Sequence, residues 1–398
     1  MKKKDVLMVT HFTQIEGEKG NGRFLYIANN LDYEKINLEI VTTNFSHRTK
    51  QYREKSGKTT PYKLTLLNEP SYVKNVSLKR FYSHYIFSIN VRKYLNNRTK
   101  PDLIYCSVPS LDCAYEVSKY AKKNNIKLIL DIQDIWPEAF KLIFNIPILS
   151  NIIYFPMYRI AKKIYSNADN IIAVSDTYLK LGEKFNKNLK SSDVIFLGTE
   201  LKLFDKLSDG YEKFIDNRNF VIAYIGTLGH NYSIKTIIEA IKLLEDKGIQ
   251  NIKFLVMGDG PLKSDFENYA KKRIRSYEFT GRLSYEQMVK RLKASDIAVN
   301  PIVNGAASII NKVGDYSAAG LGVINTQECE EYRELIEKFS IGINCENDDF
   351  KGISEAINTV YHNKELLKCM GKNNRKLAEL KFDREITYKK IYELIMEE

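Results

Sequence analysis

Residues 297–326 carry the pattern that most restricts how this chain can fold. An apolar run at 297–302 leads into a loop of small residues, a helical pattern over 311–319, Gly320 and a second apolar run at 322–326. Strand, loop, helix and strand form a βαβ unit, whose crossover makes the two strands parallel and puts the loop at their carboxyl edge. Ligands of open parallel sheets bind at that edge.

The loop and the first turn of the following helix form a candidate anion site. Small residues allow a ligand to approach the backbone, and the free N–H groups of the helix start carry the positive end of its dipole. Lys312 lies in that turn, where a cation is disfavoured unless an anion is near. Asp315 shares its face and could accept hydrogen bonds from a sugar diol. The alternative is a solvated salt bridge between the two.

Similar units follow one another along the chain and predict an α/β fold with parallel sheets. Each half opens with a strand, a glycine-bearing loop and a helix, which predicts two Rossmann-like domains facing each other across a cleft. We expect a first domain over 1–200, a second over 201–380, and a C-terminal helix over 381–398 that crosses back to the first. The charged stretch 199–219 is expected to join the domains.

The composition fits a globular intracellular protein. The chain has 398 residues, too many for one core to serve, and 44% of them are hydrophobic. Five cysteines without CxxC spacing and the lack of a cleavable signal favour a reducing cytoplasm. The longest apolar run, 142–158, is interrupted by polar residues and prolines, so it predicts a buried or surface-lying helix rather than a membrane span.

The net charge of +12 is concentrated in the first half. Residues 1–200 hold 31 basic and 19 acidic side chains, whereas residues 201–398 hold 30 of each. Within the first half, residues 51–100 hold 11 basic and 2 acidic side chains. Such a patch attracts phosphate, nucleic acid or an anionic membrane.

A series of motifs in the second half resembles the family-4 glycosyltransferases with the GT-B fold. In order, they read IGTLG, GDGP, TGRLS, ASDIAVNP and NKVGDYSAAGLGVI. In the first half, GEKGNGRFLYIANNL resembles the glycine loop of that family and LILDIQDIWPEAF its acceptor-side element. The DIWPE and NKxxxY forms are most similar to the branch that builds bacterial capsule, O-antigen or exopolysaccharide.

The resemblance implies a hexosyl- or N-acetylhexosaminyltransferase with a nucleotide-sugar donor, expected to be a UDP-sugar. It places the donor diphosphate near the first glycine loop and Lys312, the ribose at Asp315, and the base at the backbone of Arg282. The donor-binding residues expected on this basis are Gly20, Gly22, Arg23, Gly226, Thr227, His230, Gly260, Arg282, Leu283, Asn304, Ala306, Ser308, Lys312 and Asp315.

The chain departs from the family pattern at four positions. Ala307 stands where the first of two glutamates is usual, Thr227 and Tyr232 replace an arginine and a lysine, and Gln133 replaces a histidine. Lys312 and His230 could supply the positive charge that is lost at the substituted positions. On the basis of the resemblance, the expected catalytic residues are Lys312, Gln133 at the histidine position, and the adjacent Asp134.

The resemblance implies transfer with retention of configuration, in which the protein mainly stabilises the leaving group. No DxD motif is present, so we expect no metal and no other cofactor. Asp134 could orient or deprotonate the acceptor hydroxyl. The alternative for Asp134 is a structural helix cap ahead of Trp136 and Pro137.

The basic first domain has an expected role at a membrane. Residues 77–95 interleave Lys79, Arg80, Arg92 and Lys93 with aromatic side chains, including Phe81 and Phe87. Such a helix can lie on an anionic bilayer and bring the cleft to a polyprenyl-diphosphate-linked or glycan acceptor. This predicts a cytoplasmic protein, peripheral on the inner face of the membrane. The alternative is an ordinary domain helix with snorkelling lysines.

Three other functions compete with transfer. A non-catalytic GT-B subunit that binds glycan or stabilises a partner transferase is favoured by the substituted positions and opposed by the retained Lys312 and Asp315. A nucleotide-sugar epimerase would need a carboxylate pair and a histidine, which we do not find. Nucleic-acid binding is supported only by the positive charge of residues 51–100, and no recognised nucleic-acid-binding module accompanies that charge. We read His11, His47, His84 and His362 as structural or surface residues.

Overall fold

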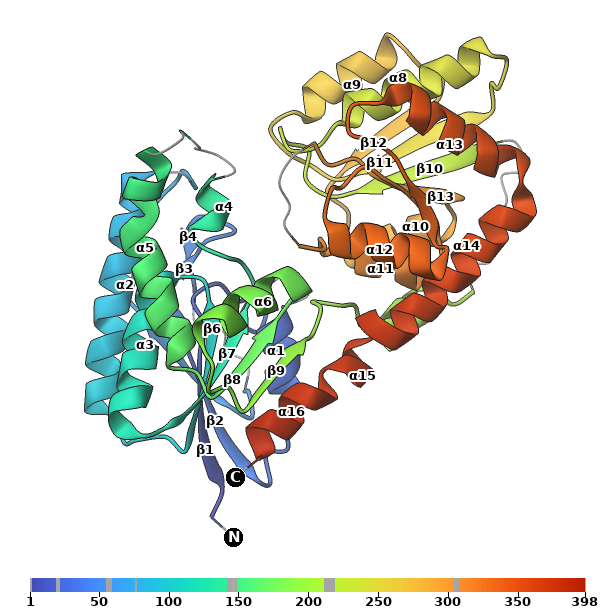
Figure 1. Cartoon of the computed structure of the whole chain (residues 1–398). Coiled ribbons are helices and arrows are strands. Elements are labelled where there is room, and N and C mark those ends of the chain that lie inside the picture. Colours follow the sequence, from blue (N-terminus) through green and yellow to red (C-terminus); the bar gives the residue numbers. More distant parts are fainter. Residues whose placement is uncertain are drawn as a thin grey trace. The chain divides into compact units, whose positions relative to one another are not determined.

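A computed structural model describes residues 2–18, 22–54, 59–75, 77–141, 146, 149–210, 219–303 and 308–397. The chain divides into two compact units, drawn in Figure 1. Unit 1 comprises Met1–Ile195 and Tyr388–Glu398, and unit 2 comprises Phe196–Thr387. The sequence prediction had put these boundaries at 200 and 381.

Unit 1 is built on a seven-stranded sheet of order β5-β2-β1-β6-β7-β8-β9, in which every neighbouring pair is parallel. A separate antiparallel pair, β3 with β4, follows β2. The strands are β1 (Lys4–Val9), β2 (Ile36–Thr43), β3 (Phe45–Ser46), β4 (Gln51–Tyr52), β5 (Lys63–Leu67), β6 (Leu103–Val108), β7 (Lys127–Ile132), β8 (Asn170–Ala173) and β9 (Ser191–Val194).

Helices cover both faces of this sheet. Val6 and Met8 of β1 share a core with α1 and the C-terminal helix α16, because alternate side chains of a strand point to one face. On the other side α2, α3 and α5 lie side by side (Figure 1). The helices of unit 1 are α1 (Arg23–Asn29), α2 (Leu78–Asn97), α3 (Leu111–Asn124), α4 (Glu138–Lys141), α5 (Leu149–Ser166), α6 (Asp176–Phe185) and α16 (Lys389–Met396).

Unit 2 is built on a six-stranded parallel sheet of order β12-β11-β10-β13-β14-β15. The expected βαβ unit is present as β13, α11 and β14, with the two strands paired in parallel. The strands are β10 (Phe220–Ile225), β11 (Ile252–Met257), β12 (Tyr277–Gly281), β13 (Ile297–Asn300), β14 (Gly322–Asn325) and β15 (Gly342–Asn344). The α/β class with parallel sheets is therefore confirmed.

Two apolar cores hold unit 2 together, one on each face of its sheet. One includes α8, α9 and α13, and the other includes α7, α10 and α11. The helices are α7 (Leu201–Ser208), α8 (Ile234–Asp246), α9 (Lys263–Lys271), α10 (Tyr285–Lys293), α11 (Lys312–Ala319), α12 (Glu330–Phe339), α13 (Phe350–His362), α14 (Lys364–Leu377), the π-helix η1 (Ala378–Phe382) and α15 (Arg384–Thr387).

Residues 350–377 do not form one continuous helix. Helix α13 ends at His362 and α14 starts at Lys364, because the Asn363 side chain accepts a hydrogen bond from the Leu366 N–H. The joining stretch contains α7, and its residues 211–218 lie outside the described residues.

Candidate functional site

Glycines bring the loops at the carboxyl edge of the second sheet into backbone contact. A Cβ on Gly258 would lie 1.8 Å from the Gly226 carbonyl oxygen, and one on Gly260 would lie 2.3 Å from that of Leu228. Gly226 itself has a φ of 138°, which disfavours a side chain there. The loops after β10 and β11 are thus closed against each other, and Gly226 faces the first turn of α11.

Lys312 occupies the centre of this edge. Its ammonium lies 4.1 Å from the centroid of the Tyr224 ring and 4.4 Å from that of Tyr232. A Cβ on Gly226 would meet it at 3.3 Å. The side chain is buried, and its Nζ has no hydrogen-bond partner among the residues that the structure describes. Burial accordingly lowers the pKa of Lys312 well below its ordinary value.

An ammonium buried without an anion is costly, since its desolvation exceeds what two aromatic faces return. The two rings hold the Lys312 side chain in place but supply no negative charge. A bound anion at this edge would supply the missing partner. The solvated salt bridge between Lys312 and Asp315, the alternative for this pair, is wrong because Lys312 is buried and the carboxylate has other partners.

Asp315 is fixed by two hydroxyl groups. Its Oδ1 accepts hydrogen bonds from Thr199 Oγ1 at 3.1 Å and from the Tyr285 hydroxyl at 3.0 Å. Burial raises the pKa of Asp315. Thr199 and Tyr285 were not among the predicted site residues. No local pattern indicates Thr199, which lies in the stretch expected to join the domains.

A ladder of buried amides supports the loop that follows β13. Asn300 donates to the Asn325 side chain at 2.8 Å, and Asn325 donates to that of Asn344 at 3.0 Å, across paired strands. Gln327 then donates to the Ser308 carbonyl oxygen at 2.7 Å. Ser308 is in this way tied to the sheet just before α11. Asn304 and Ala306, as well as the substituted position Ala307, lie outside the described residues.

The other predicted donor residues of unit 2 line the same edge. Thr227 and His230 are exposed in the loop between β10 and α8. Arg282 is exposed after β12, whereas Leu283 packs partly against the core beside α10. These positions leave Thr227, His230 and Arg282 open to a ligand.

In unit 1, Asp134 and Gln133 follow β7. Asp134 accepts hydrogen bonds from the Ile135 N–H at 2.9 Å, the Trp136 indole at 3.3 Å and the Tyr178 hydroxyl at 3.4 Å. Burial raises the pKa of Asp134. The carboxylate thus holds the Trp136 ring, as a structural residue would, and also has the raised pKa that suits a base. The Gln133 Nε2 is buried and has no hydrogen-bond partner within the described ranges.

The prediction that Arg23 binds the donor needs correction. Its guanidinium is buried in the core of unit 1, where Nε donates to Asp131 at 2.7 Å and Nη1 donates to the Ile195 carbonyl oxygen at 2.9 Å. A side chain committed in this way anchors α1 to the sheet. Gly22 precedes α1, and Gly20 lies outside the described residues.

The four basic residues expected at the membrane separate into two groups. Lys79, Arg92 and Lys93 are exposed on α2, with Arg92 lying 3.7 Å from Glu116. Arg80 instead turns inward, 5.1 Å from the centroid of the Trp136 ring. Phe87, expected among the membrane-facing aromatics, is fully buried, which corrects that part of the prediction.

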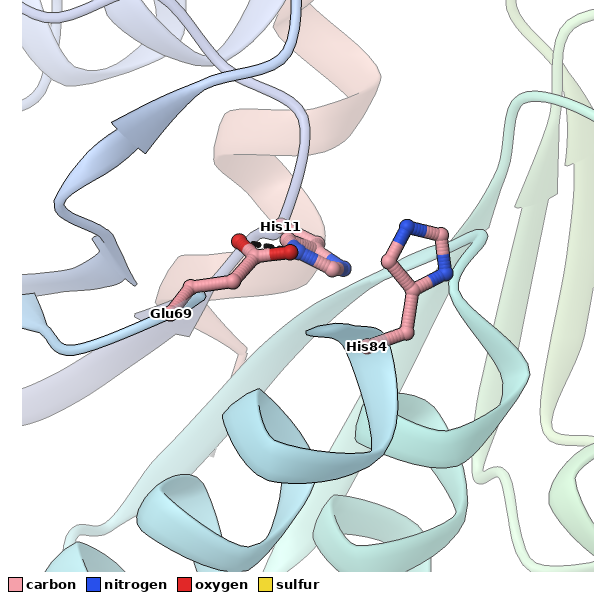
Figure 2. A group of neighbouring side chains, drawn as sticks. All are labelled: His11, Glu69 and His84. Carbon is pink, nitrogen blue, oxygen red and sulfur yellow. Dashed lines mark hydrogen bonds and ion pairs between the residues drawn. The ribbon is translucent and has the colours of Figure 1, made fainter. Parts of the chain in front are cut away.

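Figure 2 shows His11, Glu69 and His84, the group among the described residues whose ligand atoms lie close enough, within 4.8 Å, to share a metal ion. Both ring nitrogens of His11 are already hydrogen-bonded, to Ser110 Oγ at 2.7 Å and to Glu69 at 2.8 Å. Arg80 Nε lies 3.4 Å from His84 Nε2. A guanidinium opposes a cation at that place, so these residues fit a hydrogen-bonded core cluster better than a metal centre.

Comparisons with known proteins agree with this geometry. The family described as "Glycosyl transferases group 1" matches residues 210–377. A putative colanic acid biosynthesis glycosyl transferase, WcaI of Escherichia coli, is 24% identical over 79% of this chain and 80% of its own. The capsular polysaccharide biosynthesis glycosyltransferase CapM of Staphylococcus aureus is 25% identical over 60% of this chain and 64% of its own.

Solved structures with the same fold cover nearly the whole chain. Anabaena Alr3699/HepE in complex with UDP superposes with a TM-score of 0.68 at 14% identity, over 98% of this chain and 99% of its own. WaaG, a glycosyltransferase involved in lipopolysaccharide biosynthesis, gives 0.66 at 14% identity, over 99% of this chain and 100% of its own. These likenesses confirm the GT-B fold.

Proposed function

We propose that this chain, a GT-B protein whose residues 210–377 are a group 1 glycosyltransferase domain, transfers a sugar from a UDP-sugar to a lipid-linked saccharide during bacterial surface polysaccharide synthesis. The relatives named for colanic acid and capsular polysaccharide synthesis support the pathway. The fold shared with a UDP-bound structure supports the donor.

The observation that carries the proposal is the buried Nζ of Lys312, for which the described part of the chain supplies no hydrogen-bond partner. It sits beside the Gly226 backbone at the carboxyl edge of the second sheet, where α11 begins. The ring of Tyr232 contacts Lys312. Tyr232 occupies, by its spacing along the chain, the position at which the resembled family usually has a lysine. Lys312 can therefore supply the positive charge that is lost when tyrosine replaces that lysine. A donor diphosphate would be the anion that pairs with Lys312.

Asp315 lies one turn further along α11, with its carboxylate oriented by Thr199 and Tyr285. A carboxylate held in this way can accept hydrogen bonds from the two ribose hydroxyls. Diphosphate at Lys312 and ribose at Asp315 would leave the base for the Arg282 loop. The donor would then lie along one edge of unit 2.

The reaction that this donor site suits is transfer with retention of configuration. The bond between the sugar C1 and the diphosphate oxygen breaks, and the acceptor oxygen forms a bond to C1 on the same face. Charge that develops on the leaving diphosphate is stabilised by Lys312 and by N–H groups at the start of α11. Asp134, with its raised pKa, is the proposed acceptor of the hydroxyl proton. No metal is required in this scheme.

Exposed apolar side chains on unit 1 support contact with a membrane. On α2, Leu78 is 86% exposed, Tyr82 60% and Tyr85 56%. On α5, Ile152 is 66% exposed and Phe155 58%. The two helices are joined through Phe140, whose ring lies 5.6 Å from that of Phe81 on α2 and 6.5 Å from that of Tyr154 on α5.

The exposed apolar side chains of α2 share that helix with the cations Lys79, Arg92 and Lys93, which suits an anionic bilayer surface. Across the described residues, no helix has the length and hydropathy of a membrane span. Peripheral contact is therefore the mode that we propose.

A thermal-shift screen against UDP, GDP, ADP, CDP and TDP tests the donor site. A ligand at one hundred times its Kd stabilises the native state by about 2.7 kcal/mol, which is readily measured. We expect a shift with UDP that is lost in Lys312→Ala and Asp315→Ala but kept in Lys271→Ala, a control on the exposed side of α9. Absence of any shift would instead favour a non-catalytic GT-B subunit.

A further inference from the structure

Two cations from separate elements of unit 1 converge on one residue. Lys50, in the turn between β3 and β4, donates from Nζ to the Asn75 side-chain oxygen at 2.6 Å. Arg80, in the first turn of α2, donates from Nη1 to the Asn75 carbonyl oxygen at 2.8 Å. His47 lies beside them, with its Nδ1 at 3.3 Å from Lys50 Nζ and hydrogen-bonded to the Tyr72 hydroxyl.

The positive charge of this cluster is not neutralised. Among the described residues, neither Lys50 nor Arg80 has a carboxylate within the 4.0 Å of an ion pair, and the oxygens of Asn75 are neutral. The acids that act on them from a distance are Glu69 and Asp134. Glu69 already pairs with His11, and Asp134 already accepts three hydrogen bonds.

The titration of the three groups reflects their crowding. Burial and the nearby Arg80 lower the pKa of Lys50. Burial, Lys50 and Arg80 together lower the pKa of His47 to about 3, so that His47 is neutral at physiological pH. Like charges this close repel one another unless an anion lies between them.

The cluster is both reachable and next to apolar surface. The side chains of His47, Lys50 and Arg80 are half-buried, so that solvent reaches them. Val73, which follows Tyr72 in the chain, is 82% exposed, and Phe81, next to Arg80 in α2, is 40% exposed. A ligand that suits both features carries phosphate charge beside an apolar chain.

We propose that Lys50 and Arg80 bind the phosphate or diphosphate of a lipid-linked acceptor. The inference rests on the proposed function, because it names the group by which the acceptor is held. The phosphate remains intact and serves only as a handle. The lipid lies toward the exposed side chains of Val73 and Phe81, and Tyr72, whose ring lies 4.4 Å from Lys50 Nζ, keeps that lysine in place.

Calorimetric titration with inorganic diphosphate and with farnesyl diphosphate, both at saturating UDP, tests this proposal. Saturation with UDP removes the donor site as a second place for diphosphate. The variant is Lys50→Gln/Arg80→Gln, and its matched control is Lys122→Gln/Lys123→Gln, which removes two exposed charges at the end of α3. Lys50→Gln alone serves as a second variant because its side chain is not part of the core.

We expect farnesyl diphosphate to bind at least tenfold more tightly than inorganic diphosphate. Both should bind at least tenfold more weakly to the double variant than to the control, and Lys50→Gln should lie between them. Equal binding by the double variant and the control would overturn the proposal. Equal affinity for the two probes would also overturn it, since the site would then recognise free phosphate. The same titrations distinguish this result from a failure of the donor proposal, since that failure would appear as the absence of UDP binding.

Discussion

Lys312 Nζ lies 4.1 Å from the centre of the Tyr224 ring and makes no hydrogen bond to any residue that the structure describes. Tyr224 is itself fully buried, and its hydroxyl donates to the Thr227 carbonyl oxygen at 2.7 Å. The aromatic face is therefore fixed by the loop that follows β10. The contact couples the first turn of α11 to the loop expected to meet the donor.

Replacing the buried cation should stabilise the free protein and abolish donor binding. We expect Lys312→Met to raise the free energy of unfolding by about 1–3 kcal/mol, because an apolar side chain of similar length carries no desolvation cost. UDP should no longer shift the melting temperature. Urea unfolding with and without UDP measures both effects, and Lys271→Met is the exposed control. A destabilised Lys312→Met that still binds UDP would contradict the account.

Donor binding should take up a proton. An unfolded lysine has a pKa of about 10.4, and burial lowers the pKa of Lys312 well below that value in the folded chain. Between the two pKa values the unfolded chain binds the extra proton, so this lysine lowers stability as pH falls toward its folded pKa. A diphosphate at Nζ favours the charged form and raises the pKa again.

Titrations of UDP at pH 8.5 in buffers of different ionisation enthalpy measure this uptake. At that pH the terminal phosphate of UDP, with a second pKa of about 6, is already ionised. We expect uptake of up to about one proton by the native protein and none by Lys312→Met. Heats that do not depend on the buffer would show that Lys312 is already charged before UDP binds.

Asp315 should make the site selective for ribose. The native protein is expected to prefer UDP to 2′-deoxy-UDP, and Asp315→Ala should bind both equally. Tyr285→Phe removes one of the two hydroxyls that orient the carboxylate, and one hydrogen bond of about 1 kcal/mol corresponds to roughly fivefold weaker UDP binding. Equal affinities for both nucleotides in the native protein would remove Asp315 from the ribose site.

Arg23 should prove structural. Arg23→Met leaves the buried Asp131 carboxylate uncompensated, so we expect a loss of about 3–5 kcal/mol in the stability of unit 1. Arg23→Met/Asp131→Leu removes both charges and should recover much of that loss. UDP affinity, measured where both variants are folded, should stay unchanged. A tenfold loss of UDP affinity in a folded Arg23→Met would restore Arg23 to the donor site.

Membrane contact should depend on the exposed apolar side chains of α2. Burial of a large apolar side chain contributes about 1.5–3 kcal/mol, so Leu78→Ser/Tyr82→Ser should weaken vesicle binding more than tenfold. Lys79→Gln/Lys93→Gln should weaken it only at low salt, because salt screens exposed charges. Cosedimentation with phosphatidylglycerol vesicles measures both variants. Unchanged binding by the apolar variant would exclude α2 as the contact.

The fold could be predicted where apolar periodicity was strong. The unit of β13, α11 and β14 has two buried strands and a glycine in the left-handed conformation, Gly320, at the end of its helix. The strand β15 was not predicted, since it has three residues and follows the strongly charged α12. Such short strands form only because a neighbour, here β14, is already in place.

The candidate site could be predicted from local signals but not from distant partners. A lysine in the first turn of a helix identified Lys312, and its spacing from Asp315 identified the carboxylate. The contacts of Arg23 with Asp131 and of Asp315 with Thr199 join residues far apart in the chain. No local pattern contains them, so Arg23 was assigned to the donor and Thr199 was missed.

A crystal structure of the chain with UDP is the most direct test of the central claim. The account predicts diphosphate oxygens within hydrogen-bond distance of Lys312 Nζ and the ribose hydroxyls on the Asp315 carboxylate. UDP bound with Lys312 still facing only the Tyr224 and Tyr232 rings, or bound away from the carboxyl edge of the second sheet, would contradict it.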